Sequence, residues 1–231
     1  MNTDYPRLAL SLFLLALLTL PASLRAAESI VPEDYGQNNS AINQAIMASL
    51  QSSLKAMEGD PEAQYQQGLN GLFAKDLKRA VEWFKLAAEK GHKGAMYYLG
   101  IAYLNGEGIE KDQHKALDYL SQSAEAGNAD AQAALGTLSY TGIENVLSPN
   151  ANAAFIWYLK AAKNGHKQSQ YNVAFCYYQG VGTNASQFPE AYAWAKLATE
   201  PAEGQQCDPK ATEMVQYFDS IFNEDGKKYS E

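Results

Sequence analysis

Apolar residues recur with a helical period in four related segments of the chain. Within residues 79–91 they fall at Ala80, Trp83, Phe84, Ala87 and Ala88, at spacings of three and four. Residues at these spacings share one face of an α-helix, so the pattern predicts an amphipathic helix. A glycine follows three of the four segments, at a place where helices commonly end in a left-handed residue. These glycines are Gly91, Gly127 and Gly165.

The four segments are copies of one phrase. They read RAVEWFKLAAEKG (79–91), KALDYLSQSAEAG (115–127), AAFIWYLKAAKNG (153–165) and EAYAWAKLATEPA (190–202). Their shared aromatics, at steps of 36, 38 and 37 residues, are Trp83, Tyr119, Trp157 and Trp194. A second apolar helix is expected before each phrase. Because a pair of short helices cannot bury both of its faces, the pattern predicts helix-turn-helix units that stack on one another.

The best preserved unit carries a family resemblance. Its shared positions are Ala95, Leu99, Gly100, Tyr103, Gly106, Gly108, Asp112, Lys115 and Ala116. This pattern resembles the Sel-1-like repeat, a relative of the tetratricopeptide repeat with a longer loop between its helices. The resemblance covers roughly residues 61–200. It implies an all-α fold, a right-handed α-solenoid of about four helix-turn-helix repeats with N- and C-terminal capping helices. The repeats are expected at 61–92, 93–128, 129–166 and 167–200.

The N-terminal segment has a different character. Residues 8–20 are apolar and uncharged, and small residues follow them. A membrane span needs about 20 apolar residues, so this shorter run predicts a secretory signal peptide over residues 1–26. A periplasmic protein follows from that prediction, and the alternative is an inner-membrane anchor formed by an uncleaved signal. Residues 27–60 are expected to hold a linker and the N-terminal capping helix, and residues 201–231 the C-terminal capping helix and a polar tail.

The charge of the chain narrows the range of partners. The formal net charge is −8, and removing residues 1–26 would make it −9. An acidic surface repels phosphate groups, so neither nucleic acid nor an anionic membrane is an expected partner. No stable membrane insertion is expected after cleavage. A protein with a basic surface is favoured.

Candidate catalytic chemistry is sparse. The three histidines are scattered, and His92 and His166 follow helix-ending glycines, where solvated turn residues are expected. The S-x-x-K match at Ser52–Lys55 has no K-T-G or S-D-N to accompany it. The chain is therefore predicted to be no enzyme and to need no metal or cofactor. Cys176 and Cys207 are a possible disulfide, and a buried free thiol at Cys176 is the alternative.

On the first helix of each unit, a stripe of aromatic and aliphatic residues is not explained by the repeat pattern. By resemblance to tetratricopeptide repeats, it should line a concave groove that binds a partner. The alternative is that the curvature of the solenoid buries the stripe as ordinary core. The candidate groove residues are Tyr97, Ile101, Leu104, Tyr140, Tyr171, Phe175 and Tyr178.

These observations predict a non-catalytic, periplasmic protein that binds another protein through its repeats. The family resemblance favours an immunity protein that neutralises a secreted (type VI) toxin such as a phospholipase. An envelope scaffold or regulatory adaptor is one alternative. A binder of peptidoglycan fragments or other small ligands is another.

Overall fold

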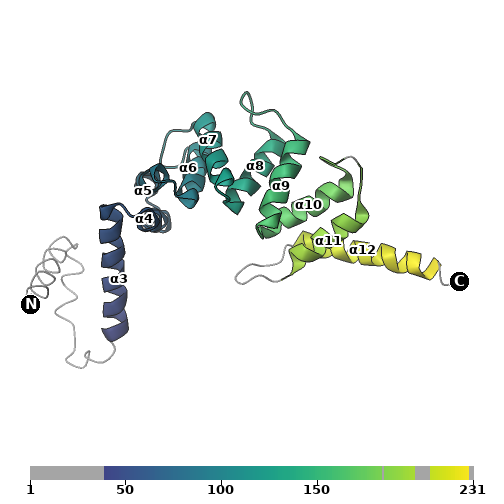
Figure 1. Ribbon diagram of the computed structural model, residues 1–231, viewed down its shortest axis with the longest axis horizontal. Coiled ribbons are helices and arrows are strands. Elements are labelled where there is room, and N and C mark those ends of the chain that lie inside the picture. Colours follow the sequence, from purple (N-terminus) through teal and green to yellow (C-terminus); the bar gives the residue numbers. More distant parts are fainter. Residues whose placement is uncertain (1–38, 184, 201–208, 229–231) are drawn as a thin grey trace, which may run out of the picture. The chain divides into compact units, whose positions relative to one another are not determined.

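Helices joined by short loops make up the structure, a computed structural model (Figure 1). It describes residues 39–183, 185–200 and 209–228, with side chains for residues 48–183, 185–200 and 209–221. This part of the chain contains no strand, which confirms the all-α repeat fold. The predicted signal peptide lies outside the described residues. The helices are α3 (Asn39–Glu58), α4 (Pro61–Phe73), α5 (Leu77–Glu89), α6 (Lys93–Asn105), α7 (Gln113–Glu125), α8 (Ala129–Thr141), α9 (Ala151–Lys163), α10 (Lys167–Gln179), α11 (Phe188–Thr199) and α12 (Pro209–Lys228).

The chain divides into two compact units, residues 1–51 and residues 52–231. The end of α3 and all later helices belong to the second unit. There, each helix from α4 to α11 packs against the helix that follows it. The pairs α4–α5, α6–α7, α8–α9 and α10–α11 correspond to the four expected units, and we call their members first and second helices.

Seven successive helices, α4 to α10, begin in the same way. A side chain at the N-cap accepts a hydrogen bond from the backbone N–H three residues later, at 2.7 to 3.2 Å. Such a bond satisfies one of the amide groups that a helix start leaves without a partner. The capping residues are Asp60, Asp76, His92, Asp112, Asn128, Asn150 and His166.

Glycine ends three of the second helices, as predicted. Gly91, Gly127 and Gly165 have φ angles of 82°, 80° and 83°, in the left-handed region that only glycine adopts at little cost. The chain therefore turns sharply after each second helix and enters the next repeat.

First and second helices approach closely at one glycine in each of the first three units. A Cβ on Gly100 would lie 2.7 Å from Cγ of Leu120, and one on Gly136 would lie 2.5 Å from the ring of Tyr158. In the fourth unit Ala174 replaces the glycine and Ala195 replaces the large partner. Both alanines are fully buried. This unit therefore pairs two small residues where the other three pair a glycine with a large side chain.

A buried glutamine joins each of three first helices to the helix before it. The side-chain amides of Gln64, Gln132 and Gln170 donate to the carbonyls of the residues eight positions earlier, at 3.1, 2.9 and 3.2 Å. The acceptors are Ala56, Ala124 and Ala162. In α6 the equivalent residue is Met96, which has no donor.

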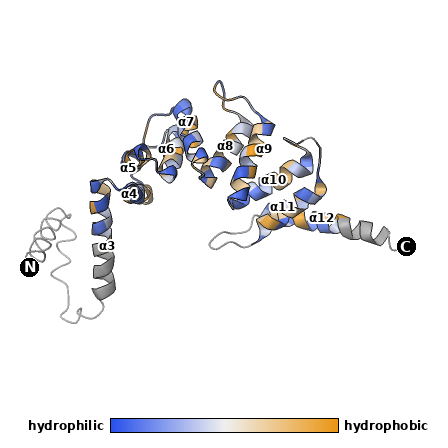
Figure 2. Ribbon diagram, in the orientation of Figure 1, coloured by the Kyte–Doolittle hydropathy of each residue, from blue (hydrophilic) through white to orange (hydrophobic). Residues whose placement is uncertain are grey.

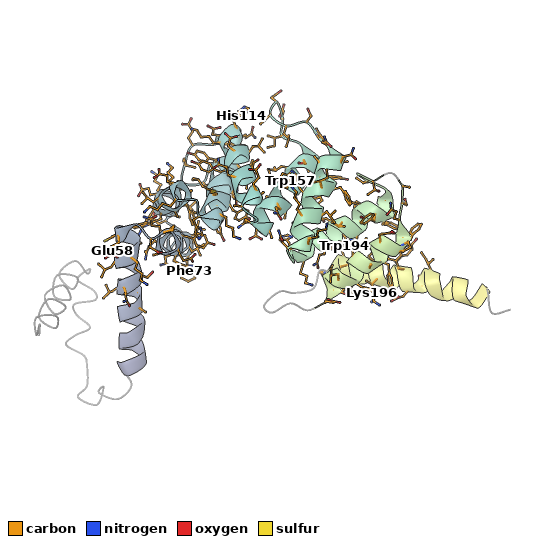
Figure 3. The ribbon with its side chains drawn as sticks, viewed as in Figure 1. Glu58, Phe73, His114, Trp157, Trp194 and Lys196 are labelled. Carbon is orange, nitrogen blue, oxygen red and sulfur yellow. The ribbon has the colours of Figure 1, made fainter. Side chains whose placement is uncertain are left out.

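The core is distributed along the chain rather than gathered at one centre. Three separate clusters of buried residues lie between successive helices, centred on Phe84 and Leu99, on Leu120 and Leu135, and on Tyr158 and Val173. Three of the four repeated aromatics lie beside these clusters, namely Tyr119, Trp157 on α9 and Trp194 on α11, and Figure 3 labels the two tryptophans. Each unit therefore depends mainly on its neighbours for burial.

The close contact at Gly100 predicts that the effect of Gly100→Ala on stability changes sign when Leu120 is also replaced. Gly100→Ala alone should lower the urea midpoint of unfolding, because the new methyl group clashes with Leu120. In a Leu120→Ala background the same change should raise the midpoint, since the clash is gone and alanine favours the helix by about 1 kcal/mol over glycine. Equal effects of Gly100→Ala in both backgrounds would contradict this account of the helix pair.

Candidate partner-binding surface

The first helices carry few charges. Each of α4, α6, α8 and α10 has a single Asp, Glu, Lys or Arg, and it is one of the first two residues of the helix. The second helix α5 alone has five, and in Figure 2 α7 is bluer than α6. Surfaces poor in charge and rich in aromatic groups are typical of the centres of protein interfaces.

The candidate groove residues of the second unit are half-buried between repeats. Tyr97 and Ile101 pack against the cluster around Leu120 and Leu135. Leu104 packs against the cluster of the first and second units. Much of their apolar surface is therefore buried between the repeats and does not face a partner.

Three other candidates come together at one place. Tyr140 of α8 and Tyr171 and Phe175 of α10 line a hollow of about 300 Å³, which we call the aromatic hollow. Asn172, Tyr158, Cys176 and Lys210 complete its lining, the last of them from α12. Tyr140 is 47% exposed, so this ring is open to a partner.

Tyr158 contributes a hydrogen-bonded hydroxyl group to the residues around the aromatic hollow. Its hydroxyl group donates a hydrogen bond to Oγ1 of Thr137 at 3.2 Å. Burial raises the pKa of Tyr158, while this hydrogen bond lowers it by a smaller amount. The ring is therefore held in one orientation beside Tyr140 and Cys176.

The last candidate, Tyr178, does not line the aromatic hollow. Its ring packs edge-on against Phe188, Tyr217 and Phe218, with centroids 5.8, 5.8 and 5.7 Å away. The hydroxyl group of Tyr192 also donates to Oδ1 of Asp219 at 2.6 Å. These contacts hold α12 against α10 and α11.

Sequence reasoning missed the contribution of α12 to the aromatic hollow. A signal was present, because Ala211 and Phe218 repeat the seven-residue spacing of Ser169 and Cys176, and all four side chains are buried. Residues seven apart share one face of a helix, so this face of α12 was predictable as buried. Lys210, one residue before Ala211, lines the hollow.

Of the two cysteines, the structure describes Cys176. Cys176 is buried, and burial raises the pKa of its thiol to about 11, so the thiol is protonated at neutral pH. Cys207 lies outside the described residues. The Cys176–Cys207 bridge stays a prediction.

Two histidines are not the solvated turn residues that the sequence suggested. Nδ1 of His92 accepts the N–H of Ala95, and its Nε2 lies 3.0 Å from Oε2 of Glu62 in the preceding repeat. Both side chains lie at a junction between repeats. Tyr65 also stacks on the His92 ring, with centroids 4.3 Å apart. The prediction failed because the neighbour is 30 residues earlier in the chain.

His166 repeats this arrangement two units later. Nδ1 accepts the N–H of Ser169 at 3.1 Å, and Nε2 lies 3.7 Å from Oδ1 of Asp130. Burial lowers the pKa of His166, and the charge of Asp130 opposes this in part. Within the described residues, no group of three or more His, Cys, Asp or Glu side chains could hold a metal.

Comparisons with known proteins agree with the repeat architecture. A family profile described as plant tetratrico peptide repeats matches residues 55–137, and the Sel1 repeat profile matches residues 129–166 and 167–200. A Sel1 repeat protein from Oxalobacter formigenes shares 25% identity and a TM-score of 0.65, covering 74% of this chain and 48% of that one.

The chain is a repeat protein of the Sel1 and tetratricopeptide type. A second solved Sel1-type structure is c5321, a protective antigen of uropathogenic Escherichia coli, with 26% identity and a TM-score of 0.62 over 79% of this chain and 43% of that one. These matches support a role in protein–protein interaction for this Sel1-type chain.

Among curated proteins, the chain is similar to chitin synthase regulatory factor 1 of Schizosaccharomyces pombe. The two are 33% identical over 110 residues, which are 47% of this chain and 24% of that protein. The Sel1-type chain thus spans about a quarter of the length of the first curated relatives that it matches.

The predicted periplasmic location is wrong. Four curated relatives are chitin synthase regulators of fungi, among them SKT5 of Saccharomyces cerevisiae, and not periplasmic proteins of bacteria. The prediction rested on residues 1–26 alone, which lie outside the described residues. Of the helices that the structure does describe, none is long and apolar enough to cross a membrane.

The His166 cap predicts a pH-dependent stability. Its pKa lies below the ordinary value of 6.5, so near that pH the unfolded chain binds more protons than the folded one. Stability from this group is therefore complete above pH 6.5 and is lost as the pH falls towards the folded pKa. His166→Asn should reduce this loss, since asparagine caps α8 and α9 in the same way.

Urea unfolding at pH 7.5 and pH 5.5 measures the effect. The fall in midpoint between the two pH values should be smaller for His166→Asn than for the original chain. An equal fall in both would show that the cap does not titrate with folding.

Proposed function

We propose that this chain is a non-catalytic adaptor that binds a protein partner through the aromatic hollow. The observation that carries the proposal is the convergence of Tyr140, Tyr171 and Phe175 from two repeats on one opening. The surrounding first-helix faces hold almost no charge. An aromatic or aliphatic side chain of the partner would bury its surface there, and Lys210 is the charged residue of the lining whose desolvation would oppose it.

The geometry favours this opening over the other candidate positions. Tyr97, Ile101 and Leu104 already pack within the solenoid, and Tyr178 packs against α12. Tyrosine and phenylalanine rings provide large contact areas and lose little conformational entropy on binding. The hollow therefore combines exposure with rings that their neighbours hold in place.

The names of the relatives suggest what binding accomplishes. Curated relatives are regulators of chitin synthase, and the matching segment is about a quarter of each of the first two. We infer that the partner is a protein whose activity or assembly depends on being bound by the repeats. On this view the chain supplies a docking surface and no chemistry of its own.

A second candidate is an immunity protein that neutralises a secreted toxin such as a phospholipase. The net charge of −8 favours it, because an acidic surface accelerates association with a basic partner. A binder of small saccharide fragments is the remaining alternative, since sugars also stack on exposed tyrosine rings. Each candidate predicts a different ligand for the same hollow.

Alanine at both Tyr171 and Phe175 should abolish partner binding. Loss of two central aromatic contacts typically costs at least 2 kcal/mol, or more than a tenfold fall in affinity. The measurement is co-purification from the native cell, followed by titration of the recovered partner. Ile156→Ala is the matched control, because Ile156 is 53% exposed on α9 and does not line the hollow.

The outcomes separate the candidates. Recovery of an enzyme or assembly complex whose activity depends on the chain supports the adaptor. Recovery of a secreted hydrolase that the chain inhibits supports the immunity protein. Unchanged affinity of a correctly folded Tyr171→Ala, Phe175→Ala variant would exclude the aromatic hollow as the binding site.

A further inference from the structure

A second hollow, of about 530 Å³, lies between α5, α6 and α7. We call it the second-repeat hollow. It shares no lining residue with the aromatic hollow, and its walls are chemically different. Its lining includes Ala88, Glu89, Met96, Tyr103, Asp118 and Tyr119, together with one cationic side chain, that of Lys115.

The second-repeat hollow lies where one inter-repeat hydrogen bond is missing. In the other three units a glutamine donates to the carbonyl eight residues earlier. Here Met96 takes that position and offers no hydrogen, so the carbonyl of Ala88 lacks the side-chain donor that Ala124 receives. The Ala88 carbonyl accepts backbone N–H groups of Lys90 and Gly91, the latter at 2.9 Å. The Ala124 carbonyl has the equivalent backbone donors and still accepts the amide of Gln132, so this position leaves room for a further donor.

Two tyrosine rings form an aromatic wall of the second-repeat hollow. Tyr103 and Tyr119 stack in parallel, with centroids 5.7 Å apart and planes 5° from parallel. The ammonium group of Lys115 already lies 5.5 Å from the centroid of Tyr103, and it pairs with Asp112 at 3.3 Å. The faces of these rings therefore already attract one cation of the chain itself.

Two carboxylates also line this hollow. Glu89 is the last residue of α5, and Asp118 lies on α7 one residue before Tyr119. Both are exposed, and within the described residues neither forms an ion pair. The C-terminal end of a helix such as α5 carries partial negative charge, which adds to that of Glu89.

We propose that the second-repeat hollow binds the guanidinium group of an arginine from a basic protein partner. The plane of the group stacks on the Tyr119 ring, and its N–H groups donate to Glu89, Asp118 and the carbonyl of Ala88. Arginine fits better than lysine because its flat, forked head can stack and make several hydrogen bonds at once. The net negative charge of the chain brings such a partner to the surface.

A single-arginine peptide tests this site in the full chain. The probe is acetyl-Gly-Gly-Arg-Gly-Gly-amide, and NMR follows the signals of Tyr103 and Tyr119. We expect saturable shifts with a Kd on the order of 1 mM that weaken with added salt. The same peptide with uncharged citrulline should bind at least tenfold more weakly.

Met96→Gln is the decisive variant. By analogy with Gln132, the new amide donates to the Ala88 carbonyl and takes the acceptor that the guanidinium would use, so the variant should unfold at no lower temperature and bind the arginine peptide at least tenfold more weakly. Asp118→Asn, an exposed change, should also weaken binding and serves if Met96→Gln does not fold. Glu125→Gln is the matched control, since Glu125 takes the position of Glu89 one repeat later, beside Gln132.

Several results would overturn the proposal. They are equal binding of the citrulline peptide, tighter binding of a lysine peptide, undiminished binding by folded Met96→Gln, and the absence of saturable shifts at Tyr103 and Tyr119. Because the two hollows share no residue, these results would not contradict the proposed function, which the Tyr171 and Phe175 variants test separately.

Discussion

Every unit of this solenoid depends on a close contact between its two helices. In the first three units a glycine on the first helix meets a large side chain on the second, and a Cβ there would lie 2.3 to 2.7 Å from it. The fourth unit has alanine at both positions. What the four units share is therefore a small residue, glycine or alanine, at this position of the first helix. Because this contact brings the two helices of a unit together, their other faces remain to be covered by neighbouring units, and the chain must stack.

Local patterns were enough to predict the helices and their ends. The apolar spacing from Ala80 to Ala88 and the left-handed glycines at Gly91, Gly127 and Gly165 are properties of short segments, and the structure has both. Features that join distant segments were not predictable in this way. The capping role of His92 involves Glu62, 30 residues earlier, and only the stacked repeats bring the two together.

The candidate site shows the same limit. The sequence identified Tyr140, Tyr171 and Phe175 as one stripe with Tyr97 and Tyr178, but it could not show which of these rings their neighbours would cover. Tyr97 packs between repeats, and Tyr178 packs against α12. Some residues of the stripe are therefore part of the core, and others remain available to a partner. Lys210 enters the lining from a helix beyond the four repeats.

The central claim is that a protein partner contacts the aromatic hollow. A photoreactive benzoylphenylalanine at position 175, introduced in the native cell, tests this claim most directly. Our account predicts a covalent adduct with one protein, and no such adduct when the same group is placed at position 156 on α9. The same adducts from both positions, or none from position 175 in a folded and abundant variant, would contradict it.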